Sequence, residues 1–281
     1  MLKLIVKKIL AVFKIDVRIF IQKVSYLSIK QTLRENGFSK LAEELRTIKP
    51  DISRQYSNTE EFNEYWELKL RVKHAFQCSL MLKVLESLPC GKLTITIVDI
   101  GDSAGTHMEY LKELSKGRFD INTISVNLDP IAVEKIKAQG QIAILCRAEE
   151  LNLENDHKVD LFTSFQMVEH LHNPALFFRR LAKESPCNRM VVTVPYVKIS
   201  RVGLHFIHKN IQKVTFAEDE HIFELNPQDW TLLMLHSGWR VIYSQIYYQY
   251  PREIPALSFL LSRFWRRYDF EGFWELFWRK I

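Results

Sequence analysis

Hydrophobic positions along the chain change their spacing near residue 93. Before that point apolar residues recur at helical intervals, which predicts helices over 1–23, 31–49 and 59–88. After it, short runs rich in β-branched residues alternate with segments of helical period. Apolar strands separated by helices predict a parallel sheet that is covered on both faces. We therefore expect an α/β fold preceded by a helical segment.

The alternating region places its loops at regular intervals along the chain. Ligands of parallel sheets bind beyond the carboxyl ends of the strands, so the loops after residues 100, 127, 146, 164 and 194 are where we expect a site. The predicted elements are, in chain order, 94–100, 105–116, 121–127, 130–138, 141–146, 158–164, 173–184, 188–194, 227–237 and 239–248.

Residues 1–23 carry an apolar stripe beside a basic ridge. A basic amphipathic helix of this kind can lie on an anionic membrane surface. The alternative is a helix packed on its own domain with its lysines in solvent. The apolar stripe comprises Leu2, Val6, Ile9, Phe13, Val17 and Phe20, and the ridge comprises Lys3, Lys7, Lys14 and Arg18.

Residues 257–281 mix aromatic side chains with five basic residues. Tryptophan beside arginine is typical of a membrane interface, where an amphipathic ring lies between lipid and water. The alternatives are an aromatic cap folded back on the domain and a contact between subunits. The aromatic residues are Phe259, Phe264, Trp265, Tyr268, Phe270, Phe273, Trp274, Phe277 and Trp278.

The formal charge of +6 on the 281 residues belongs to the two ends. Residues 1–30 have a net charge of +6 and residues 251–281 of +2, whereas 31–250 have −2. This distribution argues against a nucleic-acid groove in the middle of the chain. It is compatible with an anionic surface that the ends contact.

The four cysteines are scattered through apolar segments, with none at CxxC or CxxH spacing. This pattern excludes a zinc or redox motif and is typical of core thiols in a reducing compartment. We find no apolar run long enough to cross a bilayer, and the first residues lack the features of a signal peptide. We therefore expect a cytoplasmic protein, with peripheral association at the inner membrane face through 1–23 and 257–281.

Small residues form a turn directly after the first predicted strand. Gly101 and Gly105 flank Ser103 in the sequence GDSAG, which opens a predicted helix. Small residues let the backbone approach a ligand, and a helix N-terminus offers free N–H groups. A dinucleotide fingerprint needs GxGxxG, so this spacing disfavours a hydride-transferring enzyme.

The loop after the second predicted strand reads SVNLDP. In nucleoside-binding α/β folds an acid at this point holds the ribose hydroxyls, and here the position is occupied by Asn127. Asn offers one acceptor and one donor group, and Asp129 lies two residues later. The alternative for Asp129-Pro130 is that it simply caps the next helix.

The loop after residue 164 brings a carboxylate and imidazoles to the expected rim of the sheet. Glu169, His170 and His172 follow a buried strand there, where they could act as a general base. The alternative for Glu169 and His170 is packing and capping at a helix start.

Five motifs in order resemble the class I S-adenosylmethionine-dependent methyltransferases, and most closely the small-molecule branch with quinone, sugar and lipid-precursor methyltransferases. They read VDIGDSAG, ISVNLDP, RAEEL, VDLFTSFQMVEHLHNP and HIFELNPQDWTLLMLHSGWRV, within 93–248. The resemblance implies a doubly wound, mostly parallel seven-stranded sheet with an antiparallel last strand. The expected domains are a helical extension (1–92), the cofactor-binding domain (93–250) and a basic-aromatic extension (251–281).

The resemblance also implies residues for S-adenosylmethionine. The methionine part would be held around the first turn, the ribose and adenine by the next two loops, and the methyl group beside the end of the fourth strand. In that order the implied residues are Asp99, Gly101, Ser103 and Gly105, then Asn127, Leu128, Ala148 and Glu149, then Phe165 and Gln166.

Three positions depart from the family pattern: Ser103 replaces a glycine, Asn127 an acid, and Arg147 an aspartate. They motivate an alternative, a non-catalytic protein of the same fold that acts as a binding or scaffolding module. Some family members hold a metal with an ExxEH motif, but Gln166 stands at its first position here. We therefore expect no metal.

Methyl transfer from a sulfonium is an in-line displacement, so the protein mainly aligns the reactants and excludes water. A hydroxyl acceptor also needs a base, for which the candidates are Glu169, His170 and His221. His221 lies in a motif that in relatives faces the acceptor pocket, and 195–225 is long enough for a lid or substrate wall that includes His205 and His208. We expect a small-molecule, sugar or lipid-linked acceptor. The sequence leaves open its identity, the attacked atom and the oligomeric state.

Overall fold

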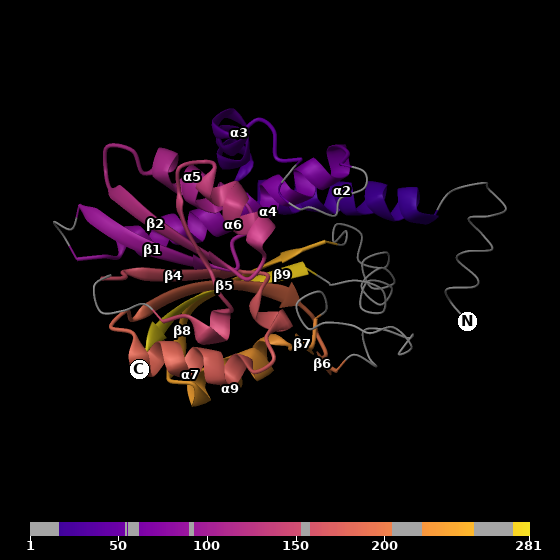
Figure 1. Ribbon diagram of the computed structural model, residues 1–281. Coiled ribbons are helices and arrows are strands. Elements are labelled where there is room, and N and C mark those ends of the chain that lie inside the picture. The colour runs from indigo at the N-terminus through magenta and orange to yellow at the C-terminus, as the bar shows by residue number, and fades with distance from the viewer. Residues whose placement is uncertain are drawn as a thin grey trace.

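The computed structural model describes residues 17–53, 55, 62–89, 93–152, 158–203, 221–249 and 272–281. Its centre is a seven-stranded sheet in the order β3-β2-β1-β4-β5-β9-β8 (Figure 1). The strands are β1 (Thr94–Ile100), β2 (Asp120–Asn127), β3 (Ile142–Leu145), β4 (Leu161–Phe165), β5 (Arg189–Tyr196), β8 (Trp239–Tyr248) and β9 (Gly272–Lys280). Strands β1 to β5 pair in parallel, and β9 is antiparallel to both of its neighbours. The predicted doubly wound sheet of the methyltransferase type is confirmed.

Helices cover both faces of this sheet (Figure 1). One face carries α2 (Val17–Glu35), α3 (Ser39–Ile48), α4 (Glu64–Glu86) and α5 (Thr106–Leu114). The other carries α7 (Pro174–Glu184) and α9 (Pro227–His236), while α6 (Pro130–Lys137) packs against β2 and β3. Short elements complete the described chain: the 3₁₀ turns η1 (Ala148–Glu150) and η2 (Val168–His170), and the ribbon of β6 (Arg201–Val202) with β7 (Phe223–Glu224).

The central strands are buried on both sides because their side chains alternate between two cores. In β1, Ile95 and Ile97 belong to the core beneath α4 and α5, whereas Val98 and Ile100 belong to the core beneath α7 and α9. Burial on both faces explains why β1 reads as a nearly continuous apolar run. Parallel pairing of β1 with β2 and β4 brings their carboxyl ends to one edge of the sheet, where the predicted site loops lie.

The strand β9 corrects the interpretation of the C-terminal residues as an extension with a membrane-facing role. For 272–280 that interpretation is wrong, because these residues form a buried strand between β5 and β8. Phe273 and Phe277 pack into the core beneath α4, and Trp274 and Trp278 into the core beneath α7. Adjacent aromatic pairs, here Phe273-Trp274 and Phe277-Trp278, fit a two-sided strand as well as they fit a lipid interface. Residues 257–271 lie outside the described residues.

The N-terminal helices share the core of the sheet, so the predicted boundary at 92 does not separate two packing units. Val72, Phe76 and Met81 of α4 pack with Ile95 and Ile97 of β1. The helix predicted over 31–49 is wrong as a single element, because Gly37, with φ +71°, separates α2 from α3. The membrane-facing stripe predicted for 1–23 lies largely outside the described residues. Among the described helices, none combines the length and hydropathy that a membrane span needs.

Candidate functional site

The turn after β1 is organised by the carboxylate of Asp102. Its Oδ1 accepts the backbone N–H groups of Ala104 (3.1 Å) and Gly105 (2.8 Å), and its Oδ2 accepts the Ser125 hydroxyl (2.7 Å). Gly101 and Gly105 have φ values of +92° and +70°, which favour glycine. The sequence indicated the turn but missed Asp102 as the residue that holds it.

Ser103 does not strain this turn. Gln166 is the sole non-glycine residue with positive φ among the described residues, so Ser103 adopts a conformation open to any side chain. The substitution of serine for glycine therefore carries no backbone cost here.

A cavity of about 510 Å³ opens over Gly101 at the carboxyl ends of the strands. Six residues that the family resemblance implied for the cofactor line it: Gly101, Asn127, Leu128, Ala148, Glu149 and Gln166. The structure thus brings together the predicted residues of four separate loops, while their contacts with a cofactor remain a prediction. Residues that the sequence did not assign to the cofactor also line the cavity: Cys146, Arg147, Met167 and His170.

Asn127 joins the first two loops. Its Nδ2 donates to the carbonyl of Asp102 (2.8 Å), and its Oδ1 accepts the N–H of Asp129 (2.8 Å). A carboxylate could make only the second of these bonds, because it has no donor. The amide keeps one further N–H and one lone pair for a ligand in the cavity. Asp129 caps α6 through Ile131 N–H (2.9 Å), which confirms the capping alternative.

A second cavity of about 80 Å³ adjoins the first, and Gly101 and Gln166 line both. It contains three further predicted residues, Asp99, Ser103 and Phe165. Gly105 lines neither cavity, and its role is the start of α5. Gln55, Lys73 and Gln77 also line the second cavity, although they precede every motif in the sequence.

A buried polar network backs the second cavity. Gln77 donates to Thr193 Oγ1 (2.9 Å) and accepts from His107 Nε2 (2.8 Å), whose other nitrogen lies 3.9 Å from Asp99 Oδ2. Burial, assisted by the charge of Lys73, lowers the pKa of His107 to about 3, so the ring is neutral at pH 7. Burial and the neighbouring Asp102 raise the pKa of Asp99 well above its usual range.

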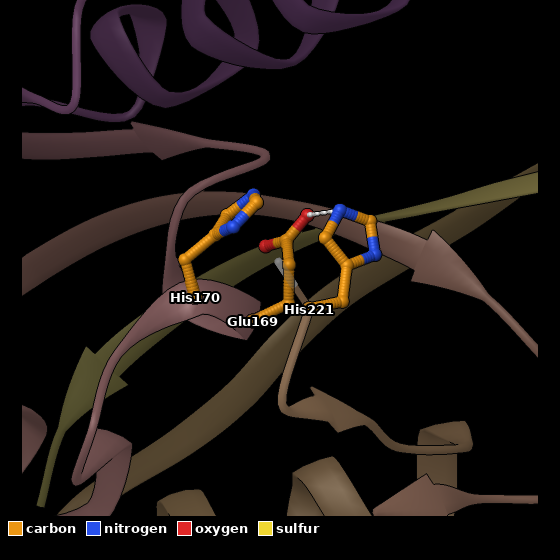
Figure 2. A group of neighbouring side chains, drawn as sticks. All are labelled: Glu169, His170 and His221. Carbon is orange, nitrogen blue, oxygen red and sulfur yellow. Dashed lines mark ion pairs between the residues drawn. The ribbon is translucent and has the colours of Figure 1, made fainter. Parts of the chain in front are cut away.

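The three predicted base candidates form one group (Figure 2). Glu169 is fully buried, and the ring of His221 approaches it so that Nε2 lies 4.0 Å from Oε1. The rings of His170 and His221 meet edge to face, with centroids 4.5 Å apart. Burial raises the pKa of Glu169 to about 7, although the nearby His221 opposes this shift.

The ribbon of β6 and β7 holds His221 in this group, since β7 begins shortly after His221 in the chain. The N–H of Ile222 donates to the backbone oxygen of Glu169 (3.0 Å), which pins the ribbon beside η2. His221 Nδ1 is hydrogen-bonded to Glu224 Oε1 (3.0 Å), and Glu224 pairs with Arg201. The sequence missed Glu224 as a partner. His205 and His208 lie outside the described residues.

Ligand atoms of Glu169, His170 and His221 lie within 4.8 Å of one another, as do those of Asp99, Asp102 and His107. In the second group Asp102 is already committed to the turn. Both carboxyl oxygens of the buried Glu169 lack a hydrogen-bond partner, and Nε2 of His221 lies 4.0 Å from Oε1, beyond hydrogen-bond distance. The absence of a metal therefore remains a prediction, and it is tested below.

Comparisons with known proteins agree with this fold. Residues 98–183 match the family described as Methyltransferase domain. The fold is similar to a putative sarcosine dimethylglycine methyltransferase from Galdieria sulphuraria (13% identity, 85% of this chain and 98% of that chain, TM-score 0.56). It is also similar to magnesium protoporphyrin IX methyltransferase from Synechocystis PCC 6803 with bound S-adenosylhomocysteine (11%, 90% and 100%, 0.52). A third similar structure is geranyl diphosphate methyltransferase in complex with S-adenosylmethionine (11%, 80% and 93%, 0.51). No curated protein sequence matches the chain.

The two cavities suit S-adenosylmethionine. The larger one offers the Asn127 amide and apolar walls to a nucleoside, between the bare backbone of Gly101 and the side chain of Leu128. The smaller one is polar, and buried side-chain atoms of Gln55, Asp99 and Gln166 on its wall lack a hydrogen-bond partner. Buried polar atoms without partners are rare in proteins and indicate a ligand or ordered water.

Proposed function

We propose that this chain is a class I S-adenosylmethionine-dependent methyltransferase that transfers the methyl group to a hydroxyl oxygen of a small-molecule, sugar or lipid-linked acceptor, as the match to a methyltransferase domain supports. The cofactor supplies an activated methyl group on a sulfonium. The protein holds the acceptor oxygen in line with that methyl group, excludes water and removes the hydroxyl proton.

The orientation of His221 is the observation that carries this proposal. Glu224 lies at hydrogen-bond distance from Nδ1, which favours the tautomer with the proton on that nitrogen. Nε2 is then the nitrogen that takes the proton, and the imidazolium that forms lies between the carboxyl groups of Glu224 and Glu169.

His170 connects this base to the cavity. It lines the large cavity and contacts the ring of His221, whereas Glu169 is buried behind both. We assign His221 as the base, Glu169 and Glu224 as the residues that position and stabilise it, and His170 as the acceptor-facing side chain. A base of this kind serves hydroxyl acceptors, because a neutral amine can be methylated before it loses its proton.

The acceptor class is supported by charge and by the similar folds. The net charge of −2 on residues 31–250 disfavours nucleic acid. Two of the similar proteins are named for small molecules, magnesium protoporphyrin IX and geranyl diphosphate. The basic segment 1–23 and the aromatic segment 257–271 favour an acceptor at an anionic membrane surface, with the protein peripheral on its cytoplasmic side.

The experiment is methyl transfer from labelled S-adenosylmethionine to a panel of hydroxyl, amine and carbon acceptors, with and without anionic liposomes. We expect label on a hydroxyl acceptor with the wild type and little with His221→Ala, while both bind S-adenosylhomocysteine equally. Label on amines alone, or full activity in His221→Ala, would contradict the proposal. No saturable cofactor binding at millimolar concentration would favour the alternative, a non-catalytic binding module.

A further inference from the structure

The smaller cavity lies between helix α4 and the turn after β1, so two distant parts of the chain build its wall. Helix α4 supplies Lys73 and Gln77, and the loop before it supplies Gln55. The strand end and turn supply Asp99 and Ser103. A water needs about 10–15 Å³ of such space, so 80 Å³ holds a small polar group.

The wall of this cavity carries both hydrogen-bond acceptors and a positive charge. Asp99 Oδ2 and Gln55 Oε1 are buried acceptors that make no hydrogen bond, and Gln166 Nε2 is a buried donor that makes none. The ring of His107 is neutral because burial depresses its pKa. Lys73 is therefore the positively charged side chain among the lining residues.

Lys73 itself is almost buried. Only 8% of its surface is exposed, and its Nζ lies 5.6 Å from the centre of the Phe273 ring. Its charge is felt by neighbouring titratable groups, since it contributes to the lowered pKa of both His74 and His107. An ammonium held at low exposure on a cavity wall attracts an anionic ligand strongly, because water screens a buried charge less than an exposed one.

The two cavities communicate at Gly101 and Gln166. A nucleoside in the larger cavity would therefore extend its attached chain into the smaller one. The unpaired acceptors fit an ammonium group, whereas Lys73 and the unpaired donor fit a carboxylate. Together they match the two ends of an α-amino acid.

We infer that Lys73 of α4 binds the α-carboxylate of the cofactor's amino acid, and that the N-terminal helices are thus part of the cofactor site. Lys73 precedes the matched segment 98–183 and belongs to none of the motifs. The inference concerns the cofactor alone and does not depend on the acceptor or on the base.

The test compares two probes that differ by one carboxylate: S-adenosylhomocysteine and its decarboxylated analogue, which keeps the amine and the nucleoside. Calorimetry gives the affinity of each probe for the wild type, for Lys73→Met and for Lys83→Met. Lys83 is the matched control, because it is an exposed lysine on the same helix. Thermal unfolding of each variant checks that the fold is retained.

We expect Lys73→Met to weaken S-adenosylhomocysteine binding roughly ten- to hundredfold, as for loss of one charge-assisted hydrogen bond, and to leave the decarboxylated probe unchanged. Lys83→Met should leave both probes unchanged. An equal loss for both probes in Lys73→Met, or no loss for either, overturns the inference. Neither probe binding to the wild type would overturn the cofactor site as well. If the wild type and Lys73→Met bind S-adenosylhomocysteine with the same affinity, only the role of Lys73 is overturned.

Discussion

Gly101 and Met167 approach so closely that a Cβ added to the glycine would lie 2.5 Å from the Met167 Cγ and 2.7 Å from its Cβ. The contact joins the turn after β1 to the loop after β4, and both residues line the large cavity. Any side chain at residue 101 must displace Met167 or the turn. The bare backbone there keeps the floor of the cavity open.

The first prediction follows from this contact. Gly101→Val should abolish binding of S-adenosylhomocysteine and destabilise the fold by about 2–4 kcal/mol, from positive φ plus the collision. Calorimetry and chemical unfolding measure the two effects. Gly117→Ala is the control, because it has φ +79° but nothing within 4 Å of an added Cβ. It should cost about 1 kcal/mol and leave binding intact. Equal effects of the two changes would show that backbone strain alone is responsible.

The second prediction concerns the carboxylate that holds the turn. Asp102→Ala removes three hydrogen bonds and should cost at least about 2 kcal/mol of stability while weakening cofactor binding. Asp102→Asn keeps the acceptor for the two backbone N–H groups and can donate to Ser125, so it should cost less than about 1 kcal/mol. Urea unfolding of both variants checks this order. Equal losses would mean that the charge, rather than the geometry, organises the turn.

The third prediction is a pH dependence. Burial raises the pKa of Glu169 from its usual 4.5 to about 7, so the folded protein binds this proton more tightly than the unfolded chain does. The associated stability is complete below pH 4.5 and is lost as the pH rises towards 7, by about 3 kcal/mol. Glu169→Gln lacks this dependence. The stability of the variant relative to the wild type should therefore increase from pH 5 to pH 8.

The wild type and Glu169→Gln must be compared with each other, because the titration of His107 changes the stability of both proteins in the opposite direction. Its folded pKa of about 3 makes stability fall as the pH drops below the usual value of 6.5. That contribution is common to the wild type and Glu169→Gln and cancels in their difference. A difference that does not change between pH 5 and pH 8 would contradict the raised pKa.

The fourth prediction tests the strand that the sequence did not reveal. Trp278 is 2% exposed within the core beneath α7, so Trp278→Ala should cost about 3–5 kcal/mol. Leu232 on α9 is 56% exposed, and Leu232→Ala should cost less than about 0.5 kcal/mol. Binding to anionic liposomes should be unchanged in both variants, because Trp278 does not face a membrane. Weakened liposome binding by a fully folded Trp278→Ala would restore the interface interpretation.

The fifth prediction concerns metals. Methyl transfer should be unaffected by exhaustive treatment with a chelator, because burial raises the pKa of Glu169 to about 7 and a proton on its carboxyl group can neutralise it in place of a cation. Elemental analysis of the purified protein should find no stoichiometric metal. Loss of activity that returns on addition of one divalent cation would assign these ligand atoms to that metal instead.

The site loops were predictable because each follows a buried strand, and parallel strands bring their ends to one edge. Gly101, Asn127 and Gln166 could be placed on this edge from strand order alone. Lys73 and Gln77 could not, because a lysine and a glutamine on a helix look like solvent-facing residues until the helix is docked. The proximity of His221 and Glu169 likewise depends on a ribbon hydrogen bond that has no sequence signal.

The role of the C-terminal aromatic residues could not be decided from the sequence for a different reason. Adjacent pairs of large rings fit a buried strand and a lipid interface equally, so the sequence left both interpretations open. The sheet order decides between them, because β9 lies between β5 and β8. No local sequence pattern indicates that these two strands need a partner between them.

The position of β9 also sets the order in which the sheet can be completed. Strand β8 precedes β9 in the chain, and in the described sheet β9 is its one strand partner. During synthesis β8 can therefore join the sheet only after β9 has been made. Until β9 emerges, β5 has an open edge and β8 has nothing to pair with. Unfinished chains that end before residue 272 therefore expose strand edges and aromatic core, which are the features that chaperones bind and aggregates recruit.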